Sequence, residues 1–177
     1  MNNLYIFTGP SGVGKTTLSV ALAKQLGNAL VVNADDYYHE ENKENIAPWE
    51  EGGDVITARM WKRCFDMIEK SLNEGKDVIF NYLISRRELA AILEKFENYN
   101  CHFVCLMASL DELIKRDDIQ PGELQMERVK VHIKELGEQG YEKHTLDTTS
   151  LSLEEEIQII LSGKFIVEKE IGENENG

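Results

Sequence analysis

Eight residues near the amino terminus, Gly9-Pro-Ser-Gly-Val-Gly-Lys-Thr16, constrain the fold of this chain more than any other stretch. They match the pattern G-x-x-x-x-G-K-[ST], in which backbone N–H groups of a glycine-rich loop surround phosphate oxygens. The lysine of the pattern reaches the β- and γ-phosphates, and the hydroxyl that follows ligates Mg²⁺. The motif therefore predicts a site for ATP and Mg²⁺, with Thr16 as the metal ligand. The predicted nucleotide-binding residues are Gly9, Pro10, Ser11, Gly12, Val13, Gly14, Lys15, Thr16 and Thr17.

The segments on either side of the motif distinguish this site from a glycine-rich surface turn. Residues 3–8 form a short apolar run, which is typical of a buried strand. After the motif, Leu18, Leu22 and Leu26 recur at helical spacing until Gly27, a residue type that commonly ends helices. A strand, a loop and a helix thus follow one another in the order that a phosphate-binding loop requires.

Apolar strand-like runs and amphipathic helical segments alternate along the rest of the chain. This alternation is typical of an α/β fold with an open parallel sheet. The predicted strands span residues 29–33, 78–83, 101–107 and 143–147. The predicted helices span residues 54–73, 86–99, 109–116 and 128–139, and a last helix ends at about residue 161. A Ser-x-x-Glu capping box opens the helix at Ser109.

The length of 177 residues suits one domain, which we expect to span residues 1–167, and the acidic stretch 168–177 is expected to be a disordered tail. The formal net charge of −13 argues against a nucleic-acid partner, because phosphate backbones are repelled. The sequence lacks a membrane-spanning apolar run and a signal peptide, so a cytoplasmic location is predicted. The three cysteines, Cys64, Cys101 and Cys105, are expected to be buried thiols.

Polar side chains follow two of the predicted strands. Asp35 and Asp36 come directly after the strand at 29–33, and Asn81 lies near the end of the strand at 78–83. Ligands of open parallel sheets bind at the carboxyl ends of strands, so these residues are candidates for substrate contacts. Aspartates after strands also make turns or cap helices, and this alternative stays open for both. Asn81 stands where phosphate-loop enzymes often carry an acidic residue that holds the metal through water, and its amide can orient such a water or a substrate hydroxyl.

The segment 39–53 is polar and breaks any period, which is typical of a functional lid or a mobile loop. Its neighbours Tyr37 and Tyr38, and Trp49 within it, either stack on a substrate ring or pack on the body of the protein. In the helix that follows, Arg59 lies nearest the predicted pocket and is a candidate contact for an anionic substrate. The other cations of that helix are expected to pair with acidic neighbours on a solvated face.

Two arginines flank a polar stretch after the fourth strand. Arg116 ends one predicted helix and Arg128 begins the next, with Pro121 and Gly122 between them. The planar guanidinium binds phosphate oxygens through two N–H groups, so the segment 116–128 is predicted to be a lid that closes on the triphosphate. Alternatively, either arginine pairs with nearby carboxylates.

Taken with the rest of the chain, these motifs resemble the small-molecule kinases of the phosphate-loop superfamily, which includes gluconate kinase, shikimate kinase, adenylylsulfate kinase and chloramphenicol phosphotransferase. The resemblance covers residues 2–167 and is to bacterial gluconate kinase-like ATP-binding proteins in particular. It is carried by the phosphate loop, by Asn33-Ala-Asp35, by Trp61-Lys62, by Arg116-Asp117 and by Gln125-Met-Glu-Arg128.

The resemblance implies a three-layer α/β/α sandwich whose five-stranded parallel sheet has the order 2-3-1-4-5. It also implies ATP with Mg²⁺ as donor and a hydroxyl-bearing small molecule between Asp35 and the γ-phosphate. Two features depart from many relatives: Asn81 replaces an acidic residue, and the segment between Arg116 and Arg128 lacks further arginines.

The resulting hypothesis is phosphoryl transfer from ATP to a small-molecule hydroxyl. Lys15 would hold the phosphates, Asp35 would orient and deprotonate the acceptor, and Arg116 and Arg128 would neutralise charge on the equatorial oxygens. The alternatives are a nucleoside or nucleotide acceptor and an ATP-binding regulator that hydrolyses ATP slowly. A polynucleotide kinase is disfavoured by the net charge. The sequence leaves the acceptor and the oligomeric state, monomer or dimer, open.

Overall fold

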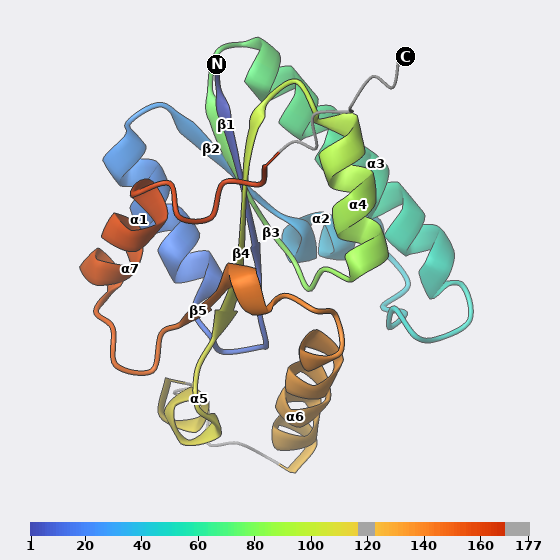
Figure 1. Cartoon of the computed structure of the whole chain (residues 1–177). Coiled ribbons are helices and arrows are strands. Elements are labelled where there is room, and N and C mark those ends of the chain that lie inside the picture. The colour runs from blue at the N-terminus through green and yellow to red at the C-terminus, as the bar shows by residue number, and fades with distance from the viewer. Residues whose placement is uncertain (117–122, 169–177) are drawn as a thin grey trace, which may run out of the picture.

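The computed structural model describes residues 1–116 and 123–168, which form a central sheet with helices on both faces (Figure 1). The strands are β1 (Asn3–Thr8), β2 (Ala29–Asn33), β3 (Asp77–Asn81), β4 (Asn100–Met107) and β5 (Thr145–Asp147). The helices are α1 (Lys15–Leu26), α2 (Ala34–Glu41), α3 (Gly53–Asn73), α4 (Arg86–Lys95), α5 (Leu110–Arg116), α6 (Glu123–Gly137) and α7 (Leu153–Leu161), with a short 3₁₀ helix, η1 (Glu142–His144).

The sheet is parallel throughout and has the order β2-β3-β1-β4-β5, as the resemblance implied. Its central strand, β1, is apolar on both faces because helices cover both sides of a parallel sheet. Leu4 and Ile6 face a core shared with α3 and α4, whereas Tyr5 and Phe7 face a second core shared with α1 and α7. Figure 1 shows α1 and α7 on one side of the sheet and α3 and α4 on the other. The predicted α/β/α fold is therefore confirmed.

The carboxyl edge of the sheet is the edge to which the candidate site residues belong. The loop after β1 leads into α1 there, and β2 and β3 also end there. In Figure 1, α5 and α6 lie beyond this edge. The sheet thus gathers the phosphate-loop motif, Asp35 and Asn81 at one end of the molecule.

Several predicted boundaries differ from the structure. β3 ends at Asn81 rather than at residue 83, although the N–H of Tyr82 still donates to the carbonyl of Phe7. α4 ends at Lys95 rather than at residue 99, and β5 begins at Thr145 because η1 takes up the preceding residues. α6 begins at Glu123, five residues before the predicted start at Arg128.

The capping box predicted at Ser109 is only half formed. The hydroxyl of Ser109 accepts from the N–H of Glu112, but the N–H of Ser109 donates to the hydroxyl of Thr149 instead of to Glu112. The Glu112 carboxylate accepts from Arg116. Complete capping boxes are present at α4 and α7.

The segment after α7 docks on the sheet. Phe165 is fully buried, its carbonyl accepts from the N–H of Phe103, and the N–H of Val167 donates to the carbonyl of Cys101. All three cysteines are buried, as predicted. Of the predicted lid, residues 117–122 lie outside the described residues, whereas 123–128 belong to α6. Residues 169–177 of the predicted tail also lie outside them.

Candidate active site

The phosphate-loop motif forms the connection between β1 and α1. Gly9 approaches the sheet so closely that an added Cβ would lie 2.5 Å from the carbonyl oxygen of Leu106. Gly14 has a φ of 102°, which favours glycine. α1 follows with no side-chain cap, so the N–H groups of its first turn are free to bind an anion. The sequence thus folds here into a cradle of backbone donors.

Lys15 lies across the mouth of this loop. Its ammonium donates to the carbonyl oxygens of Gly9 at 2.7 Å and of Pro10 at 3.1 Å. Burial lowers the pKa of Lys15 to about 8; the Asp35 carboxylate opposes this shift and the charge of Arg128 adds to it. The two carbonyl partners carry no full charge, so an incoming phosphate would add negative charge directly beside the ammonium.

The loop therefore fits a nucleoside triphosphate with Mg²⁺. The donors are backbone amides and one ammonium, and the hydroxyl-bearing Thr16 is exposed at the start of α1. The described residues contain no group of three or more His, Cys, Asp or Glu side chains that could hold a metal. This is compatible with Mg²⁺, which usually takes few protein ligands and relies on phosphates and water.

Asp35 lies in the first turn of α2, directly after β2. It is exposed, and its charge influences the pKa of Lys15, Tyr82 and His132, which come from three different parts of the fold. The N-cap of α2 is Asn33, so Asp35 and Asp36 are not its capping residues. Asp36 is exposed beside it. Asp35 thus stands within electrostatic reach of the phosphate loop, as its predicted role requires.

Asn81 is the last residue of β3, and its side chain is buried. It is only 1% exposed, and its side-chain amide donates to the hydroxyl of Ser19 at 3.0 Å. Ser19 donates in turn to the carbonyl of Lys15 at 2.7 Å. Asn81 therefore supports the start of α1 from behind, and its contact with a substrate or a metal-bound water stays a prediction.

Arg116 and Arg128, the two arginines expected in the lid, differ in their surroundings. Arg116 contacts the Glu112 carboxylate at 2.9 Å, the Val13 carbonyl at 3.2 Å, and both the hydroxyl and the carbonyl of Thr148 at 2.9 and 2.6 Å. Its guanidinium thus ties the phosphate loop to the turn after β5. Arg128 is exposed on α6, and its charge lowers the pKa of Lys15.

Two residues near Asp35 were missed from the sequence. Burial raises the pKa of Tyr82 to about 12, and the Asp35 carboxylate acts in the same direction, so its hydroxyl is a neutral donor. His132 accepts a hydrogen bond at Nδ1 from the backbone N–H of Ser11 in the phosphate loop, at 3.3 Å. In the sequence, His132 stands four residues after Arg128 on a predicted helix, so the two share one helix face. This spacing was the only indication that His132 could lie near the site.

Three cations of α3 pair with acidic neighbours, as expected for a solvent-exposed helix face. Lys62 pairs with Asp66 at 2.7 Å, and Lys70 with Glu74 at 3.9 Å. Arg63 pairs with Glu40 and Glu41 of α2, so it fastens the two helices together. Arg59 is exposed and forms no ion pair with the other residues that the structure describes. Its predicted contact with an anionic substrate stays open.

The aromatic residues around the 39–53 loop divide into two kinds. Tyr38 is buried and donates to the carbonyl of Ile46 at 3.0 Å, and the Arg63 guanidinium lies 5.0 Å from the centre of the half-buried Tyr37 ring. These two pack on the body of the protein. Trp49 is 76% exposed, so its ring is available to a ligand.

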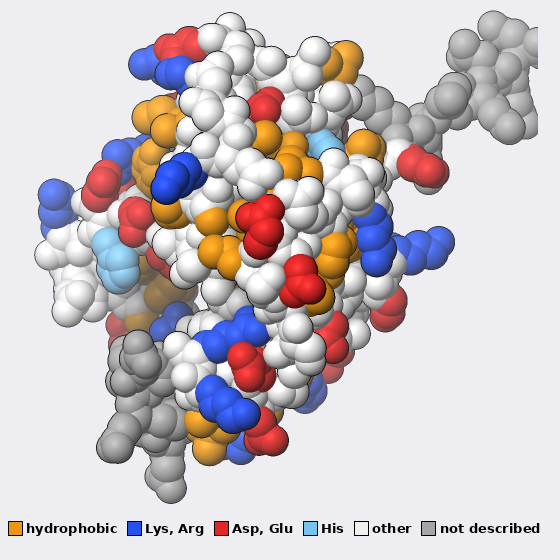
Figure 2. Space-filling model, turned by 90° about the vertical axis from the view of Figure 1, so that its left-hand side faces the viewer, with side chains coloured by type: hydrophobic (Ala, Val, Ile, Leu, Met, Phe, Trp, Pro, Cys, Tyr) orange, Lys and Arg blue, Asp and Glu red, His pale blue; other side chains and the backbone are white. Residues whose placement is uncertain are grey.

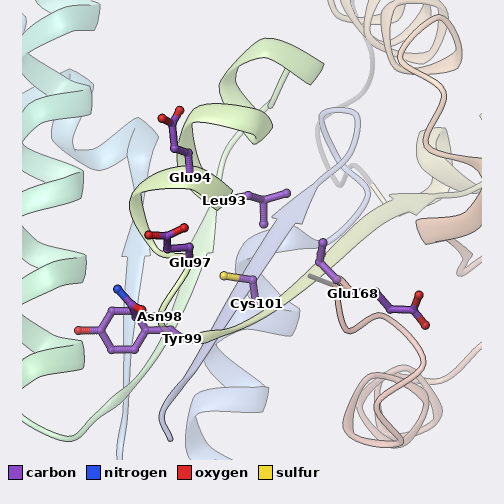
Figure 3. A pocket seen from close by; sticks show the side chains of 8 residues that line it. Leu93, Glu94, Glu97, Asn98, Tyr99, Cys101 and Glu168 are labelled. Atoms are coloured by element: carbon purple, nitrogen blue, oxygen red, sulfur yellow. The ribbon is translucent and has the colours of Figure 1, made fainter. Parts of the chain in front are cut away.

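A cavity of about 710 Å³ lies away from the phosphate loop, beside the start of β4 (Figure 3). Its wall includes the side chains of Glu94, Glu97 and Glu168, together with Tyr99 and Cys101. Three carboxylates disfavour an anion, and the amino ends of strands are not the edge where ligands of such sheets bind. We therefore place the candidate site at the phosphate loop.

Figure 2 shows a face on which acidic and basic side chains are interspersed among the residues described, rather than gathered by sign. In the described ranges, every helix is too short or too polar to cross a membrane.

A glycine-rich loop between β1 and α1, at the carboxyl edge of a sheet ordered β2-β3-β1-β4-β5, defines a phosphate-loop α/β protein. Residues 4–140 match the model of a family described as an AAA domain, and the chain belongs to this family. A comparison with curated proteins finds no match.

Solved structures with the same fold include several kinases. The chain is similar to a gluconokinase from Sinorhizobium meliloti 1021, with 18% identity, a TM-score of 0.64, and 92% of this chain and 91% of that chain covered. A shikimate kinase from Bacteroides thetaiotaomicron has 15% identity and a TM-score of 0.64, covering 91% and 97%. A tunicamycin resistance protein from Deinococcus radiodurans has 19% identity and a TM-score of 0.70, covering 96% and 100%. These likenesses confirm the predicted fold.

Proposed function

We propose that this protein is an ATP-dependent kinase that transfers the γ-phosphoryl group to a hydroxyl of a small molecule, such as a sugar acid, a related metabolite or an antibiotic. The observation that carries the proposal is the placement of Asp35. Asp35, in the first turn of α2 directly after β2, shares the carboxyl edge of the sheet with the phosphate loop, and its carboxylate raises the pKa of Lys15 against the effect of burial. A base and an anion-binding cation therefore share one edge of the sheet.

Each residue has a distinct part in this proposal. MgATP, when bound, supplies the phosphoryl group. Amides of the phosphate loop and the ammonium of Lys15 hold anionic oxygens, and the hydroxyl of Thr16 ligates the metal. Asp35 orients the acceptor hydroxyl and takes its proton on a carboxylate oxygen, while Asp36, Arg59 and Asn81 are proposed to contact the acceptor.

The two arginines of the predicted lid are proposed to act differently. Arg128 is exposed, so its guanidinium is available to neutralise charge on the transferring group. Arg116 would have to release Thr148 or the Val13 carbonyl before it could reach a phosphate. Its contribution as a catalytic residue therefore requires a rearrangement, whereas its support of the loop does not.

An acceptor screen tests the proposal. ADP formation is measured with MgATP and a panel of sugar acids, other polyols and hydroxylated antibiotics, against the rate with water alone. We expect one class of acceptor to raise ADP formation above that background. Lys15→Ala should abolish the increase, while Lys24→Ala, an exposed lysine of the same helix, should retain it. Full activity of the Lys15→Ala protein would refute the assignment.

Two other functions have specific support. The exposure of Trp49 favours a nucleoside or nucleotide acceptor, because an accessible indole can stack on a base. Thermal-shift measurements with nucleosides and sugar acids side by side separate these acceptors. The burial of Asn81 against Ser19 favours an ATP-binding regulator with slow hydrolysis, because an acidic metal-positioning residue is replaced there. A rate of ADP formation that no metabolite raises would support that function instead.

A further inference from the structure

One side chain from α6 contacts the phosphate loop directly. The backbone N–H of Ser11 donates to Nδ1 of His132 at 3.3 Å, across 121 residues of sequence. His132 is half-buried, and the contact is accessible to solvent. A ring nitrogen that accepts a hydrogen bond is unprotonated, so His132 is neutral in this arrangement, with its proton on Nε2.

The Ser11 amide belongs to the donors that the loop offers to an anion. Its only hydrogen atom is directed at His132, just as the ammonium of Lys15 is directed at the Gly9 and Pro10 carbonyls. A phosphate oxygen that takes the Ser11 amide must displace the imidazole acceptor. The displaced ring would then lie beside a dianionic group, to which a protonated imidazole can donate.

The charges around His132 determine how it responds. Burial lowers the pKa of His132, and Arg128, one turn earlier on α6, and Lys15 lower it further, whereas the Asp35 carboxylate raises it. The charges that act on the pKa of His132 are therefore two cations and one carboxylate. A bound terminal phosphate adds negative charge to this group, which favours the imidazolium. As an imidazolium, His132 has two N–H donors and no acceptor, so it cannot return to the Ser11 amide.

We propose that His132 is a ligand of the terminal phosphate, exchanging its acceptor contact with the Ser11 amide for a donor contact to a phosphate oxygen. The proton comes from solvent, so nucleotide binding is coupled to the uptake of up to one proton. This inference rests on the proposed binding of a nucleoside triphosphate at the loop. It extends the site from β1, α1 and α2 to α6.

The proposal makes the affinity for nucleotide depend on pH in a defined direction. The dissociation constant should fall as the pH falls through the window between the His132 pKa in the complex and its lower pKa in the free protein. One proton permits a change of at most about tenfold per pH unit in that window. A purely structural contact between α6 and the loop predicts no such coupling at His132, and leaves only the dependence that Lys15 contributes near its pKa of about 8.

Calorimetry of nucleotide binding provides the test. Binding of the magnesium complex of a non-hydrolysable ATP analogue, and of MgADP, is measured between pH 6 and 8 in buffers of different ionisation enthalpy. We expect proton uptake with the triphosphate analogue, less with MgADP, and with His132→Gln only the smaller uptake that the nucleotide itself and Lys15, whose pKa is about 8, contribute. His39→Gln, at an exposed histidine of α2, is the matched control and should behave like the wild type.

A readout without substitution accompanies it. NMR titration of the imidazole Cε1–H signals should show that the analogue raises the pKa of His132 and leaves that of His39 less affected. If the analogue binds but His132→Gln takes up as many protons as the wild type and the NMR pKa does not rise, this inference is wrong while the nucleotide site stands. If the wild type binds neither nucleotide, the proposed function fails together with it.

Discussion

The side-chain amide of Asn81 donates a hydrogen bond of 3.0 Å to the hydroxyl of Ser19, in the buried space between β3 and α1. The hydroxyl of Ser19 donates a hydrogen bond in turn to the Lys15 carbonyl, one turn earlier in α1. This chain of two hydrogen bonds holds the first turn of α1 against the sheet, directly behind the phosphate loop. The two hydrogen bonds must run from Asn81 to Ser19 to Lys15. The Ser19 hydroxyl has one hydrogen atom, which it donates to the Lys15 carbonyl, so it can only accept from the Asn81 amide.

Asn81→Asp should therefore destabilise the protein. A carboxylate could only accept from Ser19, which would leave the Lys15 carbonyl without its partner and bury a charge. We expect the free energy of unfolding to fall by about 2–3 kcal/mol at pH 8. Burial raises the pKa of a carboxyl group in the folded state, so the penalty should shrink as the pH falls toward 5. Urea denaturation at both pH values measures this.

The exposed Asn98 offers a matched control, since Asn98→Asp adds the same charge at the surface. It should cost less than about 0.5 kcal/mol at either pH. If Asn81→Asp were as stable as the wild type at pH 8, position 81 would be open to water or a cation, and the predicted metal-water contact would regain support.

Arg116→Gln tests whether this arginine supports the loop or contacts phosphate. Loss of the link between the Val13 carbonyl and Thr148 should lower the free energy of unfolding by about 1–3 kcal/mol and weaken nucleotide binding several-fold. Urea denaturation and calorimetric titration measure the two effects. Arg87→Gln, at an exposed arginine of α4, should change neither. Unchanged stability and affinity with a large loss of turnover would instead assign Arg116 to the transition state.

The lowered pKa of Lys15 predicts a pH dependence of both stability and binding. The pKa of Lys15 is about 8 in the folded protein, whereas an ordinary lysine, as in the unfolded chain, has a pKa of 10.5. The unfolded chain therefore binds more protons between these two pH values. Stability should therefore rise with pH from about 8 to about 10.5, relative to a Lys15→Met protein that lacks the titrating group. Nucleotide affinity should fall over the same window as the ammonium is lost. Urea denaturation at pH 8 and pH 10 measures the stability of both proteins. The same change in unfolding free energy between the two pH values in the wild type and in Lys15→Met would contradict this.

The parts of the fold that the sequence predicted are those that depend on local pattern. The strands at 29–33 and 101–107 are apolar except for Asn33 and His102, and the helix at 54–73 has one continuous apolar face, so their bounds agree with β2, β4 and α3 to within one residue. The phosphate loop was equally predictable, because its glycines and lysine have fixed spacing. The start of α6 was not, because residues 123–127 directly follow Pro121 and Gly122, a pair that is typical of a turn.

The candidate site was predicted only where a residue follows a strand directly. Asp35 met that condition, and its position relative to the phosphate loop follows from the parallel sheet. The contacts of Arg116 with Val13 and Thr148, and of His132 with Ser11, join residues 103, 32 and 121 positions apart. No local pattern encodes such pairs, because they depend on how α5 and α6 meet the edge of the sheet. For the same reason, the buried partner of Asn81 could not be foreseen.

The acceptor-dependent turnover of Asp35→Asn tests the central claim most directly. An amide keeps the size of the side chain but cannot take a proton, so turnover with the best acceptor should fall by about 10²–10⁴-fold. Binding of the magnesium complex of a non-hydrolysable ATP analogue should stay within a few-fold of the wild type, and Asp36→Asn serves as the neighbouring comparison. Undiminished turnover in the Asp35→Asn protein, with nucleotide binding intact, would contradict the account.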